Sequence, residues 1–135
     1  MKKLNFDAGV EEYRLQGGGV LRFNPGDPNL YGRFLDAEGQ MKKIEESLQK
    51  KAESTQQSAT GVLELTREAD RQLKKLLEQV FPGNDFHKAL NGVNLLAVAG
   101  NGKPVAVNLF AALEEILTAG AEAFADAQVQ GLRQA

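Results

Sequence analysis

Apolar side chains recur between residues 30 and 48 at alternating spacings of four and three positions. Because an α-helix turns once in about 3.6 residues, this alternation brings such side chains to one face of a single helix. Asp27 and Pro28 mark its start, since an aspartate caps free backbone N–H groups and proline suits the first helical position. The spacing predicts a long amphipathic helix that packs against another helix. The members of this first stripe are Leu30, Phe34, Ala37, Met41, Ile44 and Leu48.

A second stripe with the same rhythm follows a polar segment at residues 49–60. Its members are Val62, Leu65, Ala69, Leu73, Leu76 and Val80. Pro82 and Gly83 then end the helix. The polar segment either continues the first helix into solvent or breaks it near residues 54–58. Two long helices packed back to back, within one chain or between neighbouring copies, are the simplest interpretation.

The N-terminal region predicts a β-hairpin. Residues 12–16 and 20–24 alternate apolar and polar side chains on either side of three glycines, which permit the positive φ that a tight turn needs. Because an isolated two-stranded ribbon is marginal in water, its apolar side chains should rest on helices or on strands of a neighbouring subunit. These side chains are Tyr13, Leu15, Leu21 and Phe23.

Beyond the second stripe, the pattern predicts a short helix and then an ambiguous segment. Asn84 or Asp85 can cap a helix that ends at Asn91 and Gly92. Residues 93–99 form a short apolar run whose period assigns no structure, and we expect irregular or helical conformation there.

A last amphipathic helix should begin at a cap formed by Asn108 and fray over residues 128–135. Its small residues Gly120, Ala121 and Ala125 would allow close contact with another helix. Together these elements predict a mainly α protein, an N-terminal hairpin at about residues 10–25 followed by two long helices, a short helix and a C-terminal helix, in a single domain over residues 1–135.

Composition narrows the function classes. A net charge of -2, from 16 basic and 18 acidic residues, gives no strong field, so nucleic acid and membrane surfaces are poor partners. The absence of cysteine excludes disulfides and thiolate metal sites, and it fits a reducing cytoplasm. The N-terminus resembles a signal peptide only as far as Asn5 and Asp7, and no apolar run approaches bilayer length, so we expect a soluble, unexported protein.

Candidate catalytic and metal-binding residues are few. His87 has no serine or cysteine near it in sequence, so a packing or surface role is the simpler interpretation. Two glycine-rich segments superficially resemble phosphate loops, but residues 17–19 open a strand, and residues 100–103 are followed by proline where a P-loop needs Ser or Thr leading a helix. Both are expected to be turns. Glu64 and Glu68 share a helix face, but nearby arginines favour ion pairs over a metal.

Paired lysines at residues 42–43, 50–51 and 74–75 could form a basic ridge along the two long helices. Glutamates dilute this ridge, and no aromatic side chains alternate with the lysines to stack on bases. A solvated charged face is therefore expected, and we predict no cofactor, metal or nucleic acid.

Two segments carry a family resemblance. The first is the hairpin strand and helix entry VLRFNPGDPNLYGRF, and the second is EQVFPGNDFHKALNGVNLLAVAGNG, which follows a charged helical middle and precedes the final helix. In this order they resemble the small tail assembly chaperones of long-tailed (siphovirus-type) bacteriophages and prophages of Gram-positive bacteria. The resemblance covers nearly the whole chain, with Asn91 and Gly92 where the family more usually has two glycines.

The resemblance implies a non-catalytic factor of the bacterial host cytoplasm that is absent from the finished virion. Such a factor coats the tape measure protein and keeps its apolar helices soluble until the tail tube protein polymerises around it. These chaperones also self-associate, so a homo-oligomer is expected. The lack of reactive groups and the apolar stripes are compatible with this function.

The candidate partner-binding residues come from the first stripe and from the last helix. Because the pairs Leu109/Phe110 and Ile116/Leu117 cannot all face one direction, part of the last helix should stay available after the core is filled. The full set is Leu30, Phe34, Met41, Ile44, Leu48, Leu109, Phe110, Leu113, Leu117 and Phe124.

Two other function classes stay open. One is a structural tail or connector component of the virion, in which the hairpin adds a strand to a neighbour's sheet. The other is a small enzyme or regulator in which folding brings acids to His87.

Overall fold

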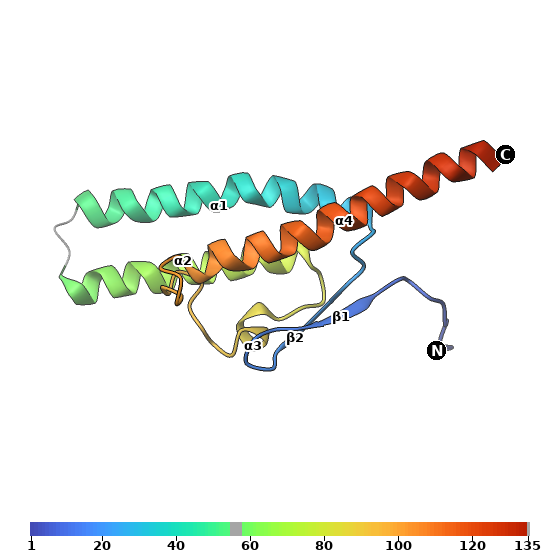
Figure 1. Ribbon diagram of the computed structural model, residues 1–135. Helices are drawn as coiled ribbons and strands as arrows, with labels where there is room; N and C mark the ends of the chain where they lie inside the picture. Colours follow the sequence, from blue (N-terminus) through green and yellow to red (C-terminus); the bar gives the residue numbers. More distant parts are fainter. Residues whose placement is uncertain (55–57, 135) are drawn as a thin grey trace.

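Helices dominate the computed structural model, which describes residues 1–54 and 58–134 and is 63% helical, and the expected fold class is confirmed (Figure 1). A two-stranded antiparallel hairpin comes first, and helices follow it. In chain order the elements are β1 (Glu11–Arg14), β2 (Val20–Phe23), α1 (Pro28–Ser54), α2 (Ala59–Val80), α3 (Phe86–Ala89) and α4 (Val105–Gln134). Within these residues no helix has both the length and the apolar character needed to cross a bilayer.

The two stripes meet as predicted, and they do so within one chain. Helices α1 and α2 run side by side in opposite directions (Figure 1). The buried side chains of α1 lie near its start and those of α2 lie toward its end, so they fall at the same end of the helix pair. Helix α1 ends at Ser54, and Ser58 caps α2 by accepting a hydrogen bond from the Gly61 backbone N at 3.2 Å. Of the two alternatives for the polar segment, the structure thus has the break, between Ser54 and Ala59, although residues 55–57 lie outside the described residues.

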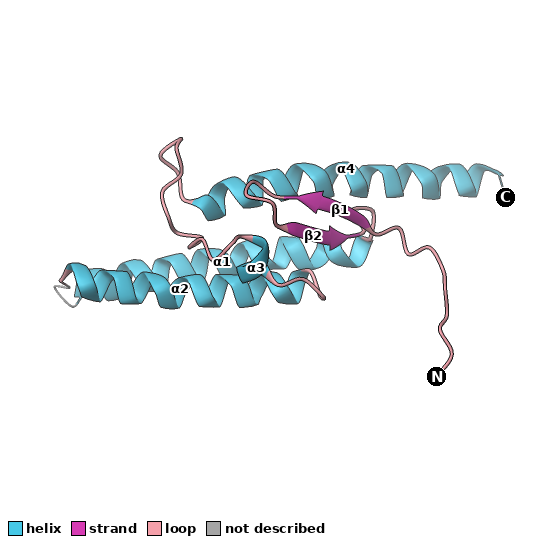
Figure 2. Ribbon diagram, turned by 90° about the horizontal axis from the view of Figure 1, so that it is seen from below, coloured by secondary structure: helices cyan, strands magenta, loops and turns pink. Residues whose placement is uncertain are grey.

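Helix α4 completes the core against the start of α1. A chain of aromatic rings joins the elements: Phe23 lies 5.0 Å from Phe81, Phe81 lies 6.5 Å from Phe34, and Phe34 lies 5.4 Å from Phe110, measured between ring centroids. Phe86 of α3 lies 5.7 Å from Phe81 on another side. Figure 2 shows the hairpin at the seam between α4 and the α1–α2 pair. One hydrophobic cluster therefore connects all the elements.

The hairpin has the expected position and pairing. Its register places Tyr13 opposite Leu21 and Arg14 opposite Val20. Gly17 and Gly18 adopt φ values of 95° and 96°, which explains the glycines in the turn. Gly19 serves a different purpose, because a Cβ atom there would overlap the carbonyl oxygen of Ala89. The hairpin turn thus packs against the backbone of the α3 region.

The segment before α4 is irregular, which is one of the two expected conformations. It includes a single antiparallel bridge between Val98 and Pro104. Helix α4 begins at Val105, so the prediction that Asn108 caps it is wrong. The first free N–H groups of the helix donate instead to the irregular segment, from Val105 to Ala97 O at 2.9 Å and from Ala106 to Leu95 O at 2.7 Å.

Two further expectations about the last helix are corrected. The helix does not fray from residue 128 but continues to Gln134. The close contact at Gly120 is with a loop and not with a helix, because a Cβ atom there would overlap the carbonyl oxygen of Pro25. The turn before α1 therefore rests directly on the α4 backbone.

Candidate functional site

The structure uses most of the predicted partner-binding residues in its own core. Buried members are Leu30, Phe34, Phe110, Leu113 and Leu117, each no more than 6% exposed. Half-buried members are Met41, Ile44, Leu48 and Leu109. Phe124 is 39% exposed and lies beyond the core. The stripe from Leu30 to Leu48 is thus an internal packing surface in this chain, and of the predicted set Phe124 is the most accessible.

The last helix carries its core-facing stripe past the rest of the protein. Ala106, Phe110, Leu113 and Leu117 are buried at spacings of four and three, and Phe124 follows seven residues after Leu117 on the same face. From Glu122 to Leu132 every residue is exposed. Figure 1 shows this half of α4 projecting beyond the body.

The projecting half of α4 has an apolar side and an acidic side. Phe124 and Leu132 are 39% and 78% exposed, and Val129 is 46% exposed. With 100° per residue, these side chains and Ala121 and Ala125 occupy one broad arc, whereas Glu122 and Asp126 lie beyond its edge. Such an arc is the kind of surface onto which a second amphipathic helix packs.

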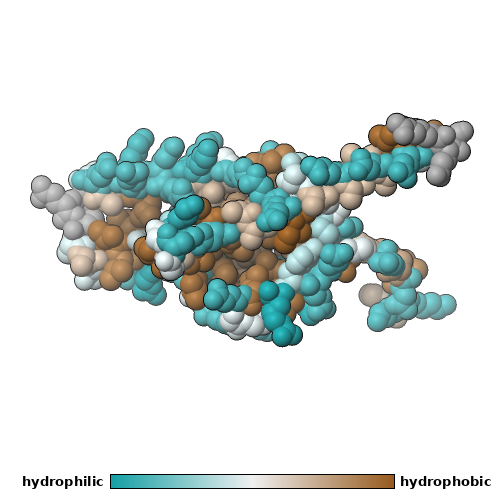
Figure 3. All heavy atoms as spheres, viewed as in Figure 1, coloured by the Kyte–Doolittle hydropathy of each residue, from teal (hydrophilic) through white to brown (hydrophobic). Residues whose placement is uncertain are grey.

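An apolar groove lies between the hairpin turn and the N-terminal half of α4. Its volume is about 510 Å³, and its apolar lining comes from Leu15, Leu90, Val93, Val105, Leu109 and Ala112. Val93 is 44% exposed there. Figure 3 shows apolar side chains in the hollow below this half of α4, and a second group between the far ends of α1 and α2. The groove was missed by sequence reasoning, because it forms only where the hairpin turn meets residues 90–112, which lie more than 70 positions later in the chain.

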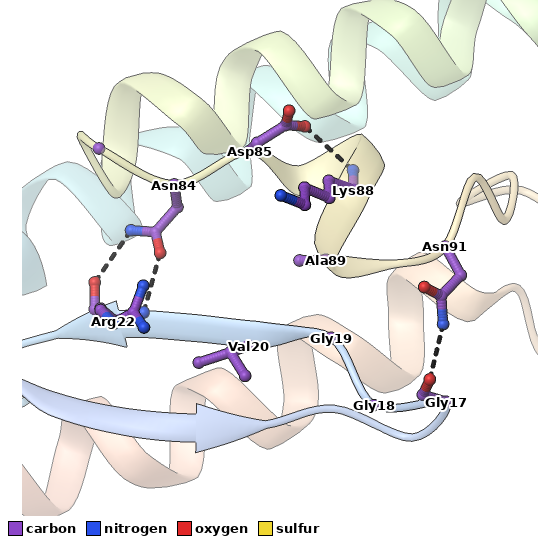
Figure 4. Close-up of a pocket in the computed structure, with 11 residues that line it drawn as sticks. Gly17, Gly18, Gly19, Val20, Arg22, Asn84, Asp85, Lys88, Ala89 and Asn91 are labelled. Atoms are coloured by element: carbon purple, nitrogen blue, oxygen red, sulfur yellow. Dashed lines mark hydrogen bonds between the residues drawn. The ribbon is translucent and has the colours of Figure 1, made fainter.

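A polar pocket of about 480 Å³ lies between the hairpin turn and α3. Its amides hold the two parts together (Figure 4): Asn84 accepts from the Arg22 N at 2.8 Å and donates to the Arg22 O at 2.9 Å, and Asn91 donates to the Gly17 O at 2.8 Å. Asp85 accepts from the Lys88 N at 3.0 Å and so caps α3. These polar groups are used in joining the hairpin to α3.

A buried ion pair lies on the other side of α3. Lys74 Nζ donates to Asp70 Oδ2 at 2.9 Å and to the Val93 carbonyl at 2.8 Å, and it lies 3.3 Å from His87 Nδ1. Both charged residues are less than 10% exposed. Because these contacts use all three protons of the ammonium group, Lys74 is committed to the fold. The solvated charged face expected for the paired lysines therefore does not include Lys74.

His87 itself is exposed at the rim of an open cavity of about 790 Å³. The side chains that line this cavity include Arg67, Arg71 and Glu78, and none of them carries a hydroxyl or thiol group. The expected packing role fits the contact of His87 with Lys74. The ion pair between Asp70 and Lys74 was not predicted from the sequence, although an Asp and a Lys four residues apart beside an apolar stripe were a usable signal.

The two glutamates considered as metal ligands each form an ion pair with an arginine one turn later on α2. Glu64 accepts from Arg67 and Glu68 from Arg71. Hydrogen bonds from Arg71 lower the pKa of Glu68 below its ordinary value, as expected for a carboxylate beside a guanidinium group. Among the described residues, no group of three or more acidic or histidine side chains is close enough together to hold a metal ion.

Comparison with protein-family models, with curated proteins and with solved structures finds no match to this chain.

Proposed function

We propose that this chain is a non-catalytic tail assembly chaperone of a long-tailed bacteriophage or prophage, which works in the host cytoplasm. In this proposal it binds amphipathic helices of the tape measure protein and keeps them soluble until tail tube protein surrounds them. The family resemblance of the two quoted segments supports the proposal. The observation that carries it is the apolar side of α4, which continues beyond the core as far as Leu132.

The chemistry of this surface suits such a client. Phe124, Val129 and Leu132 present apolar area that this chain leaves uncovered. Helix α4 carries four acidic residues, Glu114, Glu115, Glu122 and Asp126, and its first basic residue is Arg133. A client helix with an apolar stripe flanked by basic side chains would complement both features.

Co-expression with the tape measure protein tests the proposal, with the soluble fraction of that client as the readout. Phe124→Asp and Leu132→Asp should reduce this fraction, because each places a carboxylate in the apolar contact while leaving the core untouched. Ala123→Asp is the matched control, since it adds the same charge at an exposed position on the opposite side of α4. His87→Ala should also leave the rescue intact.

Phe110→Asp and Leu117→Asp do not serve this purpose, because both side chains are buried and their replacement would unfold the protein. The proposal is wrong if the α4 variants keep the client as soluble as the unchanged protein does. Loss of rescue in His87→Ala alone would instead favour a histidine-centred activity.

A structural tail or connector component is the second candidate, and the hairpin favours it. Asn84 occupies the outer edge of β2, whereas the described structure places no strand against the outer edge of β1. A free strand edge can pair with a neighbour's sheet. Stoichiometric amounts of this chain in purified particles would support the structural component over the chaperone.

A further inference from the structure

The N-terminal arm, residues 1–10, carries apolar side chains that the rest of the chain leaves exposed. Leu4, Phe6 and Val10 are 83%, 77% and 56% exposed. Figures 1 and 2 show the arm leaving the open end of the hairpin and running away from the body. Burial of exposed apolar side chains of this size against a partner contributes favourably to the free energy of association.

The apolar groove between the hairpin turn and α4 is a fitting site for these side chains. Its volume of about 510 Å³ falls within the range of roughly 300–1,000 Å³ that is usual for ligand pockets, and its lining is mainly apolar, as in such pockets. The groove is accessible from solvent, because two of its lining residues, Val93 and Ala112, are exposed.

The structure holds the arm away from the groove of its own chain. Asn24 donates to the Ala8 carbonyl at 3.0 Å and so holds the base of the arm at the open end of the hairpin. Phe6 is two residues from this anchor, and its Cα atom lies at most about 7 Å from it. The groove begins at Leu15, beyond the whole of β1, and the four residues of that strand alone span about 13 Å.

Charge also matches the arm to the groove. Lys2 and Lys3 precede the apolar residues of the arm. Glu115 lies one helical turn beyond Ala112 on α4, and Glu122 lies two turns further along the same side, and both are exposed. The groove thus leads into an acidic strip where two lysines would be favourable.

We propose that the arm of one copy docks into the groove of a second copy, with Leu4 and Phe6 in the groove and the two lysines against Glu115 and Glu122. Each copy then offers one arm and one groove. Because such a contact joins two different surfaces, repetition of it forms a ring or an extended chain. This contact uses Glu115 and Glu122 of the acidic side of α4, but it leaves the apolar arc of Phe124, Val129 and Leu132 free and does not depend on the client.

Disulfide trapping tests the contact directly, since the chain has no cysteine of its own. A Leu4→Cys chain is mixed under oxidising conditions with an Ala112→Cys chain of different mass. A mixed disulfide dimer is expected. The matched control is Ala111→Cys, because Ala111 is exposed beside Ala112 but does not line the groove.

Sedimentation velocity over a range of concentration measures the strength of the contact. Phe6→Asp and Ala112→Arg should each raise the dissociation constant about tenfold or more, as loss of a central anchor does in other interfaces. Asn5→Asp and Ala59→Arg are the controls with equal charge changes and should leave it nearly unchanged, because Asn5 is not one of the docked side chains and Ala59 is exposed at the start of α2, away from the groove. Lys2→Glu with Lys3→Glu should weaken association, and Glu115→Lys with Glu122→Lys in the same chain should restore it.

Three results would overturn the proposal. The first is a monomer at every concentration. The second is equal trapping of Leu4→Cys with Ala111→Cys and with Ala112→Cys. The third is an intramolecular disulfide in a dilute Leu4→Cys/Ala112→Cys chain, which would place the arm in its own groove. Client rescue by a strictly monomeric protein would leave the proposed function standing without this contact.

Discussion

Asp70 links α2 to the segment before α4 through both of its carboxylate oxygens, and Lys74 is its partner one turn along the helix. Oδ2 accepts from Lys74 Nζ at 2.9 Å, and Oδ1 accepts from the Leu95 backbone N at 2.8 Å. Lys74 in turn donates to the Val93 carbonyl. The pair thereby provides hydrogen-bond partners for two backbone groups of an irregular segment that packs on α2, the Val93 carbonyl and the Leu95 N–H. Burial of these groups without partners would cost free energy.

Removal of one partner of this ion pair should strongly destabilise the protein. Asp70→Ala leaves the Lys74 ammonium buried without its counter-ion and the Leu95 N–H without an acceptor, and the expected loss is about 3–5 kcal/mol in the free energy of unfolding. Urea denaturation followed by circular dichroism measures it. Glu68→Gln, which affects only an exposed ion pair, should leave the denaturation midpoint nearly unchanged.

The double variant Asp70→Asn/Lys74→Met tests whether the two charges stabilise the protein as a pair. Each single change leaves one uncompensated buried charge, whereas the double change leaves none, so the double variant should lose less stability than the sum of the two singles. Additive losses would show that the two charges do not act together.

Replacement of Gly19 or Gly120 by alanine should destabilise the protein, because neither position has room for a Cβ atom. Gly19→Ala would push a Cβ atom into the Ala89 carbonyl, and Gly120→Ala would push one into the Pro25 carbonyl. Since backbone must move in both cases, both variants should melt at lower temperature. Gly39→Ala is the control: nothing lies within 4 Å of the added atom, and alanine in a helix interior should stabilise by up to about 1 kcal/mol. A Gly120→Ala variant as stable as the unchanged protein would contradict the close approach.

Tyr13 should make stability depend on pH in the alkaline range. Burial, together with the hydrogen bond that its hydroxyl donates to Glu11 at 2.7 Å, raises the pKa of Tyr13 from 10.0 to about 12. The folded protein therefore holds this proton more tightly than the unfolded chain does. The resulting stabilisation is complete below pH 10 and is lost as the pH rises toward about 12.

The melting temperature of the protein and of Tyr13→Phe, measured from pH 8 upward, tests this dependence. The difference between the two should change over the interval set by the two pKa values, while effects of lysines and arginines cancel. A constant difference across this interval would contradict the assigned proton.

Neighbouring positions on α1 should respond very differently to truncation. Phe34 is 0% exposed and packs on Phe81 and Phe110, so Phe34→Ala should lose about 3–5 kcal/mol. Leu35 is 48% exposed, and Leu35→Ala should change stability far less. Thermal melting of both variants is sufficient, and similar losses would mean that α1 presents a different face to the core.

The sequence by itself determined the elements and most of their limits. Apolar spacings of three and four residues, Asp27 before Pro28 and glycines between alternating strands are local signals, and each element formed where its signal lay. Local periodicity works because it depends on the geometry of a single helix or strand. It also indicated that the last helix has more apolar side chains than one face can hold.

Only the tertiary structure decided which of those side chains are covered. It buried Phe110 and Leu117 and left Phe124 on a projecting helix end, because the α1–α2 pair and the Pro25 turn meet only the first half of α4. It started α4 at Val105, because carbonyls of the preceding segment took the free N–H groups. These outcomes depend on contacts between residues distant in the chain, which no local spacing encodes.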